Sequence, residues 1–414
     1  MRLEHSHTIA DDLLSMAAQS LRTSRVNEGP MTKMVTGHPQ DDARPAASSG
    51  PTTAPTAARV SKLDRLTSLR GFAALYVFIF HLERAKVFRP HWPITLGYTG
   101  VVFFFVLSGF VLTWSHVPGR KRRDFYLRRL SKIWPMHLVT TAAAYMLPVN
   151  QAAKSVLGAI LTTTLTQAWM LKNGMYTYPG NAPSWTLSCE LFFYLCFPLL
   201  IVAMLRLSER MRWLMAGGWF AITGAFTYLA THYSVDGQNL AYHFPLTRSS
   251  EFVLGIAAAL AMRGGRRIAL DPIVAFGLVI IAMAMGRHQP SPEVNVLLTV
   301  PFLLFISTVA ASEISDSRGG GHRVLRWLQW RPLVYCGEVS FAFYLVHALV
   351  IDNLVGPWHL TGVKGIAVLT VICVILSITL HHLVEKPAMK WLVERFSSRR
   401  PQTASAGLTS HKRE

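Results

Sequence analysis

The chain has 414 residues, of which 51% are hydrophobic and only 15% are charged. This balance excludes an ordinary water-soluble globular protein of this size and indicates an integral membrane protein. The formal net charge is +19, and the lysines and arginines stand in short clusters between apolar runs. Such clusters are typical of cytoplasmic loops, and the lack of interleaved aromatics argues against a nucleic-acid partner.

The N-terminal region is rich in Ser, Thr, Ala, Pro and scattered charge, and it lacks the apolar core of a signal peptide. We expect a disordered cytoplasmic tail over residues 1–62, with Met31 and Met34 as alternative starts of the chain. The membrane domain is expected over 63–395 and a disordered basic tail over 396–414. All four cysteines lie in or beside apolar runs, so neither a disulfide framework nor a metal site is expected.

Eleven apolar runs are long enough to cross or nearly cross a bilayer, which takes about 20 residues per helix. They lie at 70–88, 97–115, 134–148, 155–171, 186–205, 211–231, 250–262, 271–286, 296–311, 333–351 and 363–383. If every basic segment lies on one side, each interval between basic segments holds an even number of crossings. Only the interval with the third to fifth runs breaks this rule, so 134–148 or 155–171 is expected not to cross. The sequence thus predicts an all-α polytopic transmembrane bundle of about ten spans with both termini cytoplasmic.

The stretch "LRGFAALYVFIFH" at residues 69–81 is apolar except near its two ends. From Arg70 to His81 an α-helix rises roughly 16 Å and returns to within about 20° of the same face. We therefore expect both side chains to face one cavity, with Arg70 near the cytoplasmic surface and His81 deeper. Considered alone, Arg70 could instead extend its side chain to the lipid headgroups, and His81 could instead form a hydrogen bond that only packs two helices together.

A second polar group stands in "NAPSWTLSCELFFYLCFPLL". Trp185 is expected at an interface, Glu190 a turn and a half into a helix, and Tyr194 one turn further on the same face. An intramembrane carboxylate is a functional candidate by default, with structural pairing as the alternative. Arg248 and Glu251, three residues apart in "RSSEFVLG", are an interfacial ion pair in the simplest interpretation.

Three further segments carry candidate residues. The run "GEVSFAFYLVH" sets Ser340, Tyr344 and His347 at helical spacing, and "HHLVEKP" closes the last apolar helix with Glu385 and a proline. The basic segment "RKRRDFYLRRLSKIWP" suits anionic phosphates at a cytoplasmic mouth, although an orientation signal alone also explains its charge.

Together these segments resemble the acyltransferase-3 family of membrane O-acyltransferases over about residues 64–390. The likeness lies in an Arg and a His with ten residues between them in the first helix, then "FFFVLSGF", the basic loop ending in "IWP", "PSWTLSCELFFYLCFP", "EFVLG", "SFAFYLVH" and "HHLVEKP", in that order. Members move an acyl group, often acetyl, from cytoplasmic acyl-CoA to a sugar hydroxyl of a surface polysaccharide, lipopolysaccharide or peptidoglycan. Relatives in antibiotic producers acylate macrolides.

The resemblance implies roles for individual residues. It implies catalytic roles for His81, Glu190 and His347, and donor binding by Arg70, Arg129 and Lys132. Lys132 stands where the family has a second arginine, so it keeps the charge but loses bidentate geometry. The remaining pocket candidates are Trp185, Tyr194, Ser340, Tyr344 and Glu385.

On this interpretation His81 is the general base, since an imidazole has a pKa near neutrality. Glu190 or Glu385 orients it or shares the proton, and Arg70 and Arg129 hold the coenzyme A phosphates. The expected donor is acetyl-CoA or another acyl-CoA, without a metal, and the expected acceptor is a sugar-containing molecule at a bacterial inner membrane. Direct transfer and an acyl-histidine intermediate both remain open.

The main alternative is a secondary transporter or flippase, whose core also holds His, Glu and Arg near the midplane. That class predicts inverted repeats with Gly- or Pro-broken helices in matched halves, and the sequence shows no such repeat. A haem-binding cytochrome lacks paired histidines inside two helices, and a lipid-acylating membrane O-acyltransferase has different ordered motifs.

Overall fold

A computed structural model describes residues 62–89, 92–148, 155–170, 180–266, 270–287, 291–316 and 323–397. These residues form helices and connecting turns, and no strand occurs within these ranges. The tails predicted over 1–62 and 396–414 lie almost wholly outside the described residues. The all-α prediction is confirmed for the part of the chain that the structure describes.

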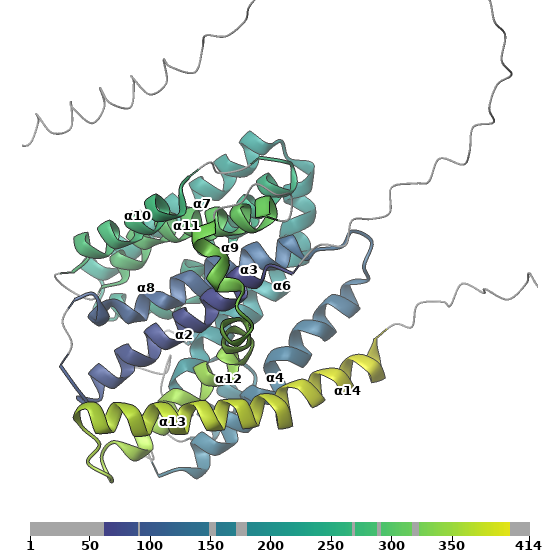
Figure 1. Cartoon of the computed structure of the whole chain (residues 1–414). Coiled ribbons are helices and arrows are strands. Elements are labelled where there is room, and N and C mark those ends of the chain that lie inside the picture. Colours follow the sequence, from purple (N-terminus) through teal and green to yellow (C-terminus); the bar gives the residue numbers. More distant parts are fainter. Residues whose placement is uncertain are drawn as a thin grey trace, which may run out of the picture. The chain divides into compact units, whose positions relative to one another are not determined.

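The helices follow one another with short connections (Figure 1). In chain order they are α2 (Asp64–Arg84), η1 (Ile94–Thr99), α3 (Gly100–Trp114), α4 (Arg122–Met146), α5 (Val156–Thr163), η3 (Gln167–Trp169), η4 (Ala182–Ser184), α6 (Trp185–Arg206), α7 (Glu209–Tyr233), α8 (Gly237–His243), α9 (Pro245–Arg263), α10 (Pro272–Met285), α11 (Pro292–Asp316), η5 (Arg323–Gln329), α12 (Arg331–Leu354), α13 (Gly362–Leu380), the π-turn η6 (His381–Glu385) and α14 (Lys386–Phe396).

Five helical segments of the described chain are long and apolar enough to cross a membrane. They are Ile94–Trp114, Ala182–Arg206, Pro292–Asp316, Arg331–Leu354 and Gly362–Phe396. The last of these joins α13 and α14 through the π-turn, and the two helices follow each other along one side of the bundle in Figure 1. An all-α membrane protein accounts for these segments.

The run at 155–171 forms no spanning helix. Its helix α5 has 8 residues, which rise about 12 Å against a hydrocarbon core of about 30 Å. The run at 134–148 instead belongs to the 25-residue helix α4. Buried His137 on α4 holds α5 in place through a 2.8 Å hydrogen bond from Nε2 to the carbonyl oxygen of Thr162.

The first turn of α2 is anchored to the end of α11. The carboxylate of Glu313 accepts hydrogen bonds from the backbone N–H groups of Asp64 (2.8 Å) and Arg65 (3.1 Å). The fully buried Arg65 side chain donates to Ser312 Oγ at 2.8 Å and pairs with Asp316. These contacts satisfy donors that a helix start otherwise leaves without partners.

The parallel helices α2 and α12 touch at their backbones. A Cβ atom on Gly337 would overlap the carbonyl oxygen of Thr67, so only glycine allows this approach. A Cβ atom placed on Gly71 would lie 3.3 Å from the Cys336 carbonyl carbon, which shows how tightly the two helices pack. The same packing continues to Phe78 and Phe343, whose ring centroids lie 5.3 Å apart.

Gly337→Ala is therefore expected to force α2 and α12 apart and to lower the free energy of unfolding by about 1–3 kcal/mol, the usual cost of overpacking. Thermal unfolding of the detergent-solubilised protein measures the effect. Gly277→Ala on α10 is the matched control, because no atom lies within 4 Å of a Cβ placed there. Equal midpoints for the two variants would contradict the prediction.

Candidate active site

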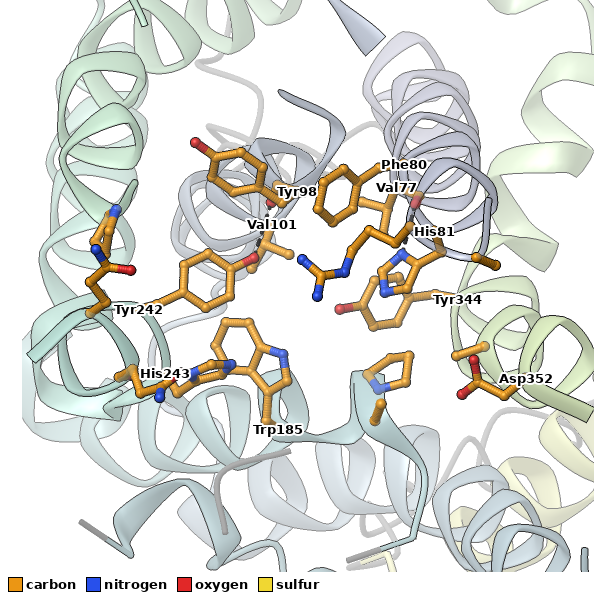
Figure 2. A pocket seen from close by; sticks show the side chains of 18 of the residues that line it. Val77, Phe80, His81, Tyr98, Val101, Trp185, Tyr242, His243, Tyr344 and Asp352 are labelled. Carbon is orange, nitrogen blue, oxygen red and sulfur yellow. Dashed lines mark hydrogen bonds between the residues drawn. The ribbon is translucent and has the colours of Figure 1, made fainter. Parts of the chain in front are cut away.

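The largest cavity described, which we call the wide chamber, has a volume of about 600 Å³. It lies between the C-terminal ends of α2 and α12, the start of α6, and α8. Figure 2 shows His81 and Tyr344 on one side of the chamber and Tyr242 and His243 on the other. Aromatic rings with a few polar groups are the usual lining of small-molecule sites.

His81 is half-buried on the chamber wall and has a defined tautomer. Its Nδ1 atom lies 2.9 Å from the carbonyl oxygen of Val77. Because a carbonyl only accepts, Nδ1 must donate the proton, and Nε2 keeps a lone pair. When the His81 ring is neutral, this hydrogen bond leaves Nε2 as the nitrogen that can accept a proton.

His347 from α12 lies directly beside His81. The two ring centroids are 4.7 Å apart and the rings are nearly perpendicular, at 77°. His347 is fully buried, and the rings of Phe78 and Tyr344 pack against it at 6.3 and 5.6 Å. Two histidines that are 266 positions apart in the chain therefore meet at one wall of the chamber.

A separate small cavity of about 40 Å³, here called the passage, lies beside the chamber on the side of Arg70. Tyr344 lines both cavities, as does Val101. Arg70, Glu190 and Ser340 line only the passage. Tyr344 thus stands between the His81 chamber and the region around Arg70.

Beyond the passage, three cations gather: Arg70 from α2 with Arg129 and Lys132 from α4. Lys132 interacts electrostatically with both arginines and with the carboxylates of Glu190 and Glu385. We call Arg70, Arg129 and Lys132 the cation cluster. Three positive charges facing two carboxylates leave a site suited to an anionic ligand.

The two carboxylates have partners other than His81. Glu190 Oε2 accepts a 3.0 Å hydrogen bond from Tyr194, one turn further along α6 as the spacing predicts. Glu385 Oε2 lies 2.8 Å from Nδ1 of His381, and both residues are buried in the π-turn. Neither carboxylate is hydrogen-bonded to His81, whose Nδ1 bonds to Val77, so the expectation that Glu190 or Glu385 orients His81 is not met in this structure.

The remaining predicted pocket residues divide between the two cavities. Trp185 lies at the base of the chamber, with its ring centroid 4.6 Å from that of His243. Ser340 lines the passage, but its hydroxyl donates to the Gly337 carbonyl oxygen of its own helix at 2.8 Å. His347, Tyr194 and Glu385 line neither cavity; each instead interacts with a residue of the site, namely His81, Glu190 and Lys132 in turn.

Sequence reasoning missed the chamber wall formed by α8, since residues 237–243 lie in a stretch expected to be a loop. Tyr242 and His243 belong to this wall. Behind Tyr242 lies the Arg248 guanidinium, 5.4 Å from the ring centroids of both Tyr242 and Phe105. A seven-residue segment of mixed polarity offers no signal for such a position, apart from its aromatic and histidine content.

Arg248 and Glu251 form a buried ion pair rather than an interfacial one. Their side chains are 3% and 6% exposed, and Nη2 of Arg248 lies 3.0 Å from Oε1 of Glu251. The expectation of an interfacial pair followed from their position near the start of an apolar run. In the structure α9 is covered by α3, α6 and α7, so even its first turns are buried.

The acyltransferase domain model of the acyltransferase-3 family matches residues 63–382. The chain belongs to this family. No solved structure matches it.

Three relatives show how far the similarity extends. Acyltransferase MdmB of Streptomyces mycarofaciens is 32% identical over 373 residues, which cover 81% of this chain and 94% of that protein. Nodulation protein 10 of Rhizobium leguminosarum bv. viciae is 26% identical over 358 residues, covering 78% of this chain and 92% of the relative. The protein named "Putative peptidoglycan O-acetyltransferase YrhL" of Bacillus subtilis (strain 168) is 24% identical over 372 residues, 81% of this chain but only 56% of the relative. This protein is therefore an acyltransferase.

Glu251→Ala is expected to lower the free energy of unfolding by about 3–5 kcal/mol, because it leaves the Arg248 charge buried without its carboxylate. Replacing both partners, as Arg248→Met with Glu251→Leu, removes the unpaired charge and is expected to restore most of the loss. Thermal unfolding of the three proteins in one detergent measures this. If the Glu251→Ala protein were as stable as the wild type, Arg248 and Glu251 would not form a buried ion pair.

Proposed function

We propose that this protein transfers an acyl group, in the simplest case acetyl, from acyl-CoA to a hydroxyl of a sugar-containing acceptor. The observation that carries the proposal is the line of sites along α2: cation cluster, passage, Tyr344, and then the wide chamber with His81. An anionic donor fits the first of these and a neutral, ring-containing acceptor fits the last.

The proposed orientation puts both termini in the cytoplasm of a bacterial cell, with about ten crossings of the inner membrane. The clusters of lysine and arginine that flank the apolar runs support it, since short loops on the cytoplasmic side concentrate these residues. The cation cluster then faces the cytoplasm, where acyl-CoA is present. The wide chamber faces the other side, so the acyl group crosses and coenzyme A stays.

In the proposed reaction Nε2 of His81 takes the proton of the acceptor hydroxyl as its oxygen attacks the thioester carbonyl carbon. The tetrahedral intermediate collapses, the carbon–sulfur bond breaks, and the thiolate of coenzyme A leaves with the electron pair. The proton on His81 then neutralises the thiolate or leaves through solvent. The hydrogen bond from Nδ1 to Val77 supports this role, because it holds the ring in the tautomer that accepts a proton at Nε2.

His347 is proposed to support His81 rather than to contact the acceptor. Its ring packs edge-on against that of His81 and is itself fully buried, so it restricts the rotation of His81. The acceptor is proposed to lie against Trp185, Tyr242 and Tyr344, whose rings surround the space in front of His81 (Figure 2). The relatives' names support an acceptor of this class, because one refers to peptidoglycan.

His81→Ala is expected to lower the turnover number by about 10²–10⁴-fold, the usual contribution of a positioned general base. Coenzyme A release from acetyl-CoA, followed with a thiol reagent in nanodiscs with a glycan acceptor, measures it. His232→Ala on the exposed face of α7 is the control with full activity expected.

Full transfer by the His81→Ala protein would show that another group is the base. If the wild type binds no acyl-CoA but moves a solute across liposome membranes, the protein is a transporter and the proposal fails as a whole.

Tyr344→Ala is expected to widen the passage and let water from the chamber reach the thioester. The ratio of acceptor-independent hydrolysis to transfer should then rise severalfold, while Tyr344→Phe, which keeps the ring, should leave the ratio near that of the wild type. Acetate and acetylated acceptor, both quantified by mass spectrometry, give the ratio. An unchanged ratio in the alanine variant would mean that Tyr344 does not separate the two cavities during turnover.

A further inference from the structure

A separate cavity of about 170 Å³ lies at the Arg70 end of the bundle, beside the turn 115–121 that joins α3 to α4. We call it the basic cavity. Its wall includes four basic side chains and a pair of phenylalanines, namely His116, Arg120, Arg122, Arg129, Phe125 and Phe197, and none of its lining residues is acidic. Of these six residues, Arg129 alone has a role in the proposed function.

The turn that carries His116 is held in place by α9. Nη1 of Arg263 donates to the carbonyl oxygens of Thr113 (2.8 Å) and His116 (3.0 Å). Burial and the positive charges of Arg263 and Arg120 lower the pKa of His116 below its usual range. The cavity is thus a place of positive potential with a fixed backbone, which favours an anion.

The opposite wall is aromatic. The rings of Phe125 and Phe197 stack at 5.3 Å with an interplanar angle of 20°, and the Arg129 guanidinium lies 5.9 Å from the Phe125 centroid. The His116 and Phe197 rings pack edge to face, with their centroids 5.9 Å apart. A stacked pair beside guanidinium groups offers both an apolar surface and donors for phosphate oxygens.

Arg129 connects this cavity with the acyl-transfer site. It lines the basic cavity and also belongs to the cation cluster, where it interacts electrostatically with Lys132 and Glu190. A ligand that extends from the basic cavity past Arg129 therefore reaches the passage. Two neighbouring anion-binding sites match a donor that carries phosphate groups at two separate points.

The volume limits what the basic cavity holds. At about 170 Å³ it has less than a third of the volume of the wide chamber, which suits one anionic group better than a larger ligand. Arg120, Lys121, Arg122 and Arg123 are all exposed, but only Arg120 and Arg122 line the cavity.

We propose that the basic cavity binds the ribose 3′-phosphate of a coenzyme A donor, with Arg122 and His116 as the residues that select it. This rests on the proposed function, because it takes an acyl-CoA donor as given. The pyrophosphate then lies at the cation cluster, and the thioester arm enters the passage toward His81. The cavity thus distinguishes coenzyme A from donors that lack the 3′-phosphate.

Acetyl-CoA and acetyl-3′-dephospho-CoA, compared as donors for the full-length protein in nanodiscs of neutral lipid, test the proposal. The wild type is expected to prefer acetyl-CoA in kcat/KM by roughly tenfold or more, as for a charge-assisted contact. Arg122→Ala should reduce this preference toward unity through a higher KM for acetyl-CoA, and Arg122→Lys should retain part of it. Arg123→Ala, an exposed neighbour outside the cavity, is the matched control.

The outcomes separate the two proposals. If the wild type consumes both donors equally, or if Arg122→Ala lowers kcat/KM for both donors by the same factor, the 3′-phosphate assignment is overturned while acyl transfer stands. If Arg122→Ala instead loses binding to phosphatidylglycerol vesicles and keeps its donor preference, the cavity serves a lipid headgroup and the assignment is likewise overturned. If the wild type consumes neither donor, the proposed function itself fails.

Discussion

Where α2 meets α12, the absence of a side chain at Gly337 lets one helix lie on the carbonyl oxygen of Thr67 in the other. Because both helices run in the same direction from this contact, residues further along each remain side by side. His81 and His347 meet as a consequence, about four turns further along α2 and about three turns further along α12. In lipid no hydrophobic force drives helices together, so such backbone proximity is the main source of a fixed geometry.

Helix α2 has ionisable side chains near both of its ends, and contacts with protein or with a cavity keep these side chains away from lipid. At its start the Arg65 side chain and two backbone donors find partners on α11. At its far end the His81 ring bonds to its own helix and faces a cavity. The guanidinium Nη atoms of Arg65 thus have protein partners and His81 lies at a cavity, which agrees with the cost of an isolated charge in hydrocarbon.

Contacts between residues of one helix could be predicted from the sequence, whereas contacts between different helices were harder to predict. The Glu190–Tyr194 contact follows from helical periodicity. Arg70 and His81 were expected to face one cavity, but Arg70 lines the passage and His81 lines the chamber, because Tyr344 lies between the two cavities. The π-turn at His381, however, gives Glu385 a partner four residues away, and periodicity alone does not predict which partner a carboxylate takes. The α8 wall was also missed, because a short helix with mixed polarity resembles a loop.

The narrowness of the passage has an energetic consequence under the proposed function. A proton taken by His81 starts in the wide chamber, whereas the thiolate is released at the Arg70 end, and about 40 Å³ of space at Tyr344 separates the two. If the proton leaves through the chamber, the thiolate is reprotonated from the opposite compartment. Each such turnover moves one elementary charge through the field, worth about 2.3 kcal/mol per 100 mV. The constriction thereby couples the chemistry of an ester bond to the membrane potential.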